Sequence, residues 1–153
     1  MSSPTVFTTA SPRFGLPLLF AGQAQKEFFV NQAHAIADSL LHPAITGRGT
    51  APPANPDAGE SWLVESGAIG DWLGHDDSLA SWQAGVWIFP APTEGMRLFD
   101  TLTGQFLLFR SGAWRSATAP AEPAGGANVD TEARNAIIDL IENLRVAGIL
   151  PSN

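Results

Sequence analysis

The sequence places its densest group of polar side chains at His75-Asp76-Asp77, between two stretches that are rich in aromatic residues. Together with Asp71, these residues offer the oxygen ligands that a hard cation such as Ca²⁺ prefers. Their spacing does not fit the loop of EF-hand proteins, and adjacent aspartates are common in solvated turns. We therefore expect no metal ion at this loop.

Nothing in the sequence favours catalysis. Asp76 and Asp77 would have to face each other across a sugar, roughly 5–10 Å apart, to serve as a glycosidase pair, and neighbours on one loop rarely do so. Ser11, His34 and Asp38 are the residue types of a nucleophilic triad, but no motif surrounds them, and no phosphate-binding loop or Gly-x-Ser-x-Gly segment occurs. We expect a protein that is not an enzyme and that uses no cofactor.

The five tryptophans offer the strongest hypothesis about binding. An indole stacks on the apolar face of a sugar ring while its N–H donates to a hydroxyl group, but it also fills the core of small β-domains. Trp62, Trp87 and Trp114 lie in strand patterns, so we expect them in the core or at a subunit interface. Trp72 and Trp82 border the polar loop, and we expect them to be exposed. The hypothesis is a sugar-binding platform made of Trp72, His75, Asp76, Asp77 and Trp82.

Two segments share one pattern, in which an aromatic residue is followed by two residues, a glycine, one residue and a tryptophan. They are Trp82-Gln-Ala-Gly-Val-Trp87 and Phe109-Arg-Ser-Gly-Ala-Trp114. Glycine adopts the positive φ that a tight turn requires, and aromatic side chains on the two arms can pair across the strands. The pattern predicts two β-hairpins of the same kind.

The elements that must position these residues follow from the periodicity of apolar side chains. Spacings of three and four predict a helix over residues 23–41, which ends at His42-Pro43 because the residue before a proline leaves the α region. A connector rich in Pro and Gly follows at 46–59, ordered in part as polyproline II. Strands are predicted at 60–65, 81–82, 86–91, 96–100, 105–110 and 113–116.

A second helix is predicted over residues 130–147, after a flexible linker at 117–128. Asp130 is a suitable N-cap, and Gly148 is suited to end the helix. The apolar stripe of this helix could pack on the β-domain of its own chain or associate with other copies. We expect a homo-oligomer, with a trimer favoured, held together by Ile137, Leu140, Ile141 and Leu144.

These elements predict an α+β fold with a small antiparallel, Trp-rich β-meander or barrel. The expected parts are an N-terminal docking arm at 1–22, a helix with the β-domain at 23–116, the linker, and a C-terminal helix at 129–153. Only 15% of the residues are charged, which favours a surface that partners cover in part. The net charge of −7 argues against nucleic acid as a ligand, and we expect no membrane insertion.

The segment Ser11-Pro-Arg-Phe-Gly-Leu-Pro17, followed by Ala21-Gly-Gln-Ala-Gln-Lys-Glu27, resembles a domain family of unknown function common in alphaproteobacterial prophages and gene transfer agents. Further motifs of that family occur in order at 51–53, 59–64, 70–75 and 82–87. The resemblance covers about residues 10–116 and is specific because several unusual motifs share one order. The segment from Val129 is similar to terminal helices of phage fibre or spike proteins.

The resemblance implies a virion component of tail-fibre or head-spike type, assembled in the bacterial cytoplasm and in contact with other virion proteins and a host surface polysaccharide. It carries over no catalytic residue. Phe14, Leu16 and Phe20 of the arm are expected to dock on a neighbour. We therefore expect a structural and adhesive subunit of a phage-like particle. The alternatives are a stand-alone carbohydrate-binding module and, less favoured, a polysaccharide-degrading enzyme.

Overall fold

The computed structural model describes residues 10–13, 16, 18–19, 26–126 and 130–152, and over these residues the chain forms two α-helices and eight short strands. The predicted α+β fold is confirmed, and most strand pairs are antiparallel. The chain divides into two compact units, Met1–Pro92 and Thr93–Asn153. Their boundary falls inside the segment 23–116, for which the sequence predicts one β-domain.

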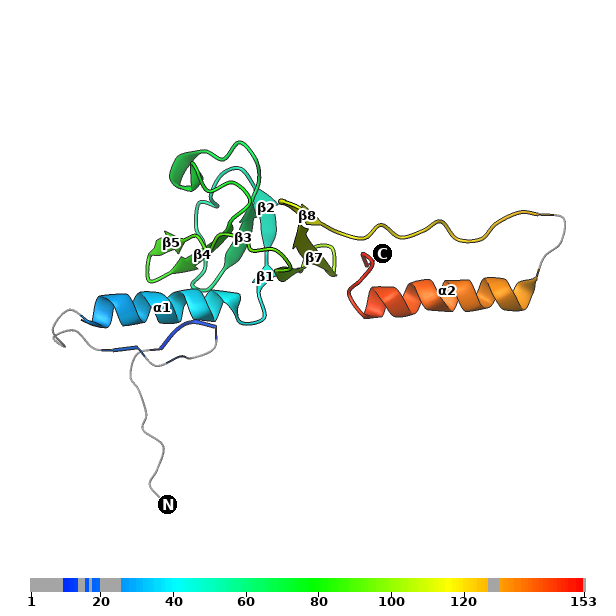
Figure 1. The fold of residues 1–153 in the computed structure, drawn as a ribbon, viewed down its shortest axis with the longest axis horizontal. Helices are drawn as coiled ribbons and strands as arrows, with labels where there is room; N and C mark the ends of the chain where they lie inside the picture. The colour runs from blue at the N-terminus through cyan, green and yellow to red at the C-terminus, as the bar shows by residue number, and fades with distance from the viewer. Residues whose placement is uncertain (1–9, 14–15, 17, 20–25, 127–129, 153) are drawn as a thin grey trace, which may run out of the picture. The chain divides into compact units, whose positions relative to one another are not determined.

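The first unit contains a sheet of four strands (Figure 1). Its strands are β2 (Gly47–Gly49), β3 (Ser61–Val64), β4 (Leu79–Gln83) and β5 (Val86–Ile88). β3, β4 and β5 are antiparallel neighbours, whereas β2 runs parallel to β3. The short strand β1 (Ala44–Ile45) precedes β2. The sequence predicts an irregular connector from residue 46 and misses both strands, because Gly-Arg-Gly shows no alternation of apolar and polar residues.

The two faces of this sheet differ because side chains alternate along each strand. The cross-strand pairs Trp62↔Ala80 and Trp82↔Trp87 place large aromatic rings on one face. The pair Ser61↔Ser81 belongs to the opposite face, where the two hydroxyl groups hydrogen-bond at 3.0 Å. One face is therefore aromatic, and the other carries these serines beside the buried pair Leu63↔Leu79.

Helix α1 (Lys26–Leu40) contacts the face opposite to the tryptophans, and polar groups make the hydrogen bonds between them. Nε2 of Gln83 on β4 donates to the Ala35 carbonyl at 3.0 Å and to the Asp38 carboxylate at 3.4 Å. Asp38 and Ser39 are the buried residues of the helix, whereas Phe29 is 71% exposed. The predicted helix is confirmed, but its apolar stripe is not the side that faces the sheet.

The N-terminal arm is tied to the end of α1 by Ser11 and Arg13. Oγ of Ser11 donates to one carboxylate oxygen of Asp38 at 2.6 Å, and the backbone N–H of Arg13 donates to the other at 3.1 Å. The Arg13 guanidinium donates to the carbonyls of Asp38, Ser39 and His42 at 2.8–3.0 Å. Carbonyls at a helix C-terminus have no partners within the helix, so Arg13 satisfies them.

Two further contacts hold the arm along α1. The backbone N–H of Leu19 donates to Oδ1 of Asn31 at 2.8 Å, and Nδ2 of Asn31 donates back to the Leu19 carbonyl at 3.0 Å. Of the three residues predicted to dock on a neighbour, Leu16 is half-buried. Phe14 and Phe20 lie outside the described residues.

The second unit begins with three antiparallel strands, β6 (Arg97–Asp100), β7 (Gln105–Arg110) and β8 (Ala113–Arg115). The sequence predicts all three to within one residue at each end. Leu98 and Leu107 are directly paired across β6 and β7 and are almost fully buried. One face of this meander therefore forms a core.

Helix α2 (Thr131–Val146) confirms the second predicted helix, including both of its ends. The Asp130 carboxylate accepts a hydrogen bond from the Ala133 N–H at 2.9 Å, and Gly148 adopts a φ of 68°. After the helix, the Gly148 carbonyl accepts a hydrogen bond from the Phe106 N–H of β7 at 2.6 Å. The C-terminal end of α2 is thus fixed to the meander of its own unit.

The four residues predicted to hold an oligomer together differ in burial. Ile141 is buried in its own unit at 4% exposure, and Leu144 is half-buried. Ile137 and Leu140 remain 45% and 58% exposed. No helix in the described part of the chain combines the length and the apolar character needed to cross a bilayer.

Candidate functional site

The aromatic face of the first unit concentrates four of the five tryptophans. Trp62 on β3 and Trp82 on β4 lie on the same face as Trp87 on β5, and Trp72 comes from the short 3₁₀ helix η1 (Gly70–Trp72). The ring centroids of Trp72 lie 6.2 Å from those of Trp62 and 5.3 Å from those of Trp87, and Trp87 lies 5.1 Å from Trp82. The tilted and edge-to-face geometries at these distances are favourable for aromatic rings.

The four rings differ in exposure. Trp72 is fully buried, in a core with Val64, Ala68 and Ala80. Trp62, Trp82 and Trp87 are half-buried and keep part of their ring surface accessible. We call Trp62, Trp82, Trp87 and Phe89 the aromatic shelf, because they lie around the buried Trp72 and its neighbours.

The expectation that Trp72 is exposed is wrong. The turn of η1 brings its ring onto the sheet, where it packs between Trp62 and Trp87. Its Nε1 is buried and has no hydrogen-bond partner among the residues that the structure describes. Trp72 therefore supports the shelf from beneath and cannot offer its own face to a sugar.

Trp62 is fixed in place by two features. Its Nε1 donates to the Glu60 carboxylate at 2.7 Å, so the indole keeps one orientation. Its ring also lies over Gly47 of the paired strand β2, where a Cβ atom would approach the ring to 2.7 Å. The absence of a side chain at Gly47 allows this close contact.

The polar loop is shaped by its own residues. The Asp76 carboxylate accepts hydrogen bonds from the backbone N–H groups of Gly67 and Ala68, each at 3.1 Å. Asp77 adopts a φ of 63°, and its N–H donates to the Val64 carbonyl at 2.9 Å. Asp76 therefore holds two loops together. In the described part of the chain, no group of three His, Cys, Asp or Glu residues is arranged to hold a metal ion.

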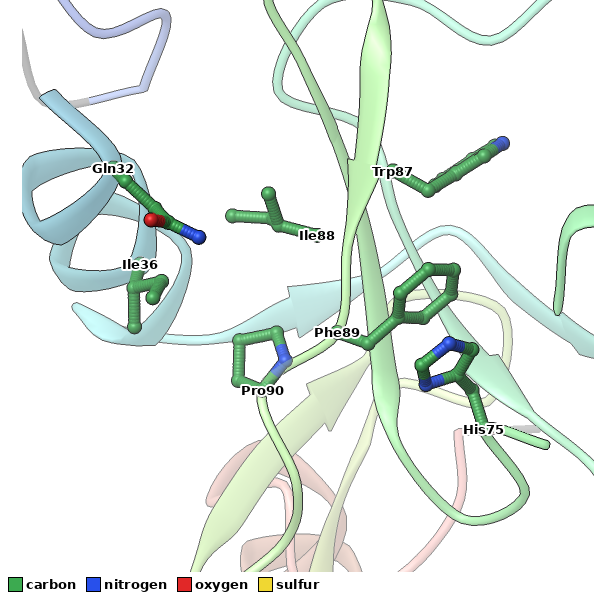
Figure 2. Close-up of a pocket in the computed structure, with 7 residues that line it drawn as sticks. All are labelled: Gln32, Ile36, His75, Trp87, Ile88, Phe89 and Pro90. Atoms are coloured by element: carbon green, nitrogen blue, oxygen red, sulfur yellow. The ribbon is translucent and has the colours of Figure 1, made fainter. Parts of the chain in front are cut away.

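His75 is the member of this loop that joins the aromatic shelf. Its imidazole stacks on Phe89 with ring centroids 3.7 Å apart and planes 5° from parallel. Trp87 and Phe89 project to the same side as His75 (Figure 2). The structure thus brings His75 and Trp82 of the predicted platform to the shelf, whereas Asp76 works as a loop anchor.

A hollow of about 320 Å³ lies at the edge of the shelf. Ile88 projects from β5 towards Ile36 and Gln32 of α1, on the side opposite to Phe89 (Figure 2). The lining residues are Gln32, Ile36, His75, Trp87, Ile88, Phe89 and Pro90. Sequence reasoning missed Phe89, although its position two residues after Trp87 in an extended segment gives the signal.

The chemistry of this region suits binding. The shelf offers ring surfaces for stacking, and the imidazole of His75 can form directed hydrogen bonds at its edge, whereas Gln32 lies on the opposite side of β5. Ser11 and Asp38 do hydrogen-bond, but the same carboxylate holds the arm to α1. In the described part of the chain, the His34 side chain makes no hydrogen bond to Ser11 or Asp38, so the three residues do not form a triad.

Comparison with known proteins points to one family. No curated protein and no solved structure matches the chain. A family model described as "Protein of unknown function (DUF2793)" matches residues 30–115, more than half of the chain, from within α1 to the end of β8. The matched segment contains the whole aromatic shelf. The chain is therefore a member of the DUF2793 family of proteins of unknown function.

Proposed function

We propose that this chain is a structural and adhesive subunit of a phage-like particle, of fibre or head-spike type, which binds a host surface polysaccharide through the aromatic shelf. The observation that carries the binding role is the set of half-buried indoles, Trp62, Trp82 and Trp87, on one sheet face. The particle role rests on the resemblance of the opening and loop motifs to proteins of prophages and gene transfer agents.

The support for the rings favours recognition of a sugar. Trp72 packs beneath Trp62 and Trp87, and Glu60 fixes the Trp62 indole. Rings held in one orientation lose little conformational entropy when a ligand binds, so more of the stacking energy appears as affinity. A sugar ring has one apolar face to stack on an indole and hydroxyl groups that can reach His75 beside Phe89.

Assembly would use helix α2 and the N-terminal arm. Ile137 and Leu140 on α2 leave an apolar strip exposed in the single chain. We propose that copies associate through this strip into a homo-oligomer, with a trimer favoured, and that the arm contacts other virion proteins. Light scattering tests this: a stable oligomer that becomes monomeric on Leu140→Asp supports it, and a clean monomer of the unaltered chain at tens of micromolar contradicts it.

Particle adsorption tests the whole proposal. Particles from a strain that lacks the gene should adsorb less to host cells than particles from the parent strain. The unaltered gene should restore adsorption, whereas Trp87→Ala should not. A gene whose loss leaves particle composition and adsorption unchanged would contradict the proposal.

A stand-alone carbohydrate-binding module is the second candidate. It is favoured by one observation: all residues of the aromatic shelf belong to the first unit, so the shelf needs no residue of another copy. Immunogold labelling of purified particles separates the two candidates. Labelled particles favour the virion subunit, and glycan binding by a chain absent from particles favours the module.

A further inference from the structure

Three arginines from three neighbouring strands share one face of the second unit. The register pairs Leu108 of β7 with Arg97 of β6 on one side and with Arg115 of β8 on the other. Directly paired residues project to the same face of a sheet, so these three form a row across the strands. Arg110 follows Leu108 by two residues and therefore projects to that face as well.

This face is the outer one. The alternate residues Leu98 and Leu107 are almost fully buried on the opposite face. Arg97, Arg110 and Arg115 are all exposed, and Phe106 is 46% exposed. The arginines thus surround apolar side chains that water reaches. We call Arg97, Phe106, Leu108, Arg110 and Arg115 the arginine face.

The arginine face is hollowed. A depression of about 480 Å³ is lined by all five of its residues together with Ile149, which follows α2. Gly148 lets the chain after α2 lie close to Phe106, because a Cβ atom at this position would come within 3.1 Å of the Phe106 ring. The depression therefore has an apolar floor and a rim of three guanidinium groups.

The charges of the three arginines are not neutralised within the described chain. None of them forms an ion pair with a carboxylate there, and the one hydrogen bond from their side chains runs from Nε of Arg115 to the Arg110 carbonyl at 3.2 Å. The carboxylate of Glu94, near in sequence, accepts from the Ser111 N–H. Like charges gathered in a chain of net charge −7 favour an anionic ligand at this place.

We infer that the arginine face binds the carboxylate groups of an acidic polysaccharide, such as one that contains uronic acids. Guanidinium groups bind carboxylates in a two-pronged, planar geometry, and the apolar floor of Phe106 and Leu108 suits the apolar face of a sugar ring. Nucleic acid fits less well, since the eight basic residues of the chain provide no extended track for a phosphate backbone. This surface is distinct from the aromatic shelf and does not depend on the function proposed for it.

Calorimetric titration of the full chain with oligogalacturonate tests the inference. Methyl-esterified oligogalacturonate is the matched neutral ligand. It should bind at least tenfold more weakly, because the ester cannot accept the charge-assisted hydrogen bonds that a carboxylate accepts from guanidinium groups. Arg115→Gln should weaken oligogalacturonate binding roughly tenfold, and Arg115→Lys should weaken it less because the charge remains. Raising the salt from about 50 to about 300 mM should also weaken it.

The controls make each outcome decisive. Arg134→Gln removes the same charge from α2 and should leave the affinity unchanged, and Trp82→Ala should leave it unchanged if the two surfaces act independently. Thermal unfolding confirms that each variant is folded. Equal binding of the esterified ligand, an equal effect of Arg115→Gln and Arg134→Gln, or tighter binding of polyphosphate than of oligogalacturonate would overturn the inference.

Discussion

The two aromatic hairpins of this protein have almost the same local structure and different surroundings. Trp82 and Trp87 are directly paired with ring centroids 5.1 Å apart, and Phe109 and Trp114 are paired at 5.2 Å. Both turns consist of two residues with positive φ, the second a glycine. What differs is the neighbourhood, because the first pair adjoins Trp72.

The residues around each hairpin therefore determine which kind of ligand-binding surface it belongs to. In the first unit, Trp72 extends the pair into a set of four tryptophans. In the second unit, the face of β7 and β8 opposite to the Phe109–Trp114 pair carries arginines around an apolar depression. One short sequence pattern thus contributes in two ways: the first hairpin adds its aromatic pair to a surface suited to stacking, and the second adds Arg110 and Arg115, on the side opposite to its aromatic pair, to a surface suited to anions.

Removal of Trp72 should break the first surface with the largest loss of stability. Trp72→Ala deletes a fully buried indole and leaves a cavity beneath Trp62 and Trp87, so we expect the free energy of unfolding to fall by about 3–5 kcal/mol. Urea denaturation followed by circular dichroism measures it. Trp114→Ala, which removes a half-buried ring, should lower the free energy of unfolding by less. A larger loss of stability for Trp114→Ala than for Trp72→Ala would contradict the supporting role of Trp72.

A methyl group at Gly47 should disturb the shelf by a smaller amount. The Cβ of an alanine at this position would lie 2.7 Å from the Trp62 ring, so Gly47→Ala must displace the ring. We expect the free energy of unfolding to fall by about 1–3 kcal/mol. Gly49→Ala on the same strand is the matched control, because its Cβ would meet only a carbonyl at 3.8 Å. Equal unfolding midpoints for the two variants would show that the Trp62 ring is not held against β2.

The two hairpin turns should respond alike to the same substitution. Gly85 and Gly112 have φ values of 80° and 71°, and a Cβ atom at either position meets nothing within 4 Å. Alanine at either position should therefore lower the free energy of unfolding only by the backbone strain of a positive φ, about 1–2 kcal/mol. Thermal unfolding of both variants measures this. A large difference between them would mean that the turns are not equivalent.

Local patterns predicted much of the fold. Gly85 and Gly112 located both hairpins, and Asp130 and Gly148 marked the ends of α2 because capping depends on a few neighbouring residues. Helix α1 was also predicted, but the side of the helix that packs on the sheet was not. Its anchor is the buried Asp38, whose partners Ser11, Arg13 and Gln83 come from distant parts of the sequence.

The candidate sites depended on long-range structure that the pattern does not contain. Trp72 stands next to a polar loop in the sequence, yet the 3₁₀ turn places it in the core. Arg97 comes from β6, whereas Arg110 and Arg115 flank one turn, and only the register of β6, β7 and β8 brings all three to one face. Burial and register are set by tertiary packing, so neither could be derived from spacing alone.

Binding to isolated host surface polysaccharide compares the two hairpins directly. Trp82→Ala and Trp114→Ala each remove one indole from a paired, half-buried position, and both variants are first shown to be folded by thermal unfolding. We expect Trp82→Ala to weaken binding about tenfold or more, as for an aromatic anchor, and Trp114→Ala to leave the affinity within about twofold. Equal affinities of the two variants, or a loss confined to Trp114→Ala, would contradict the role proposed for the aromatic shelf.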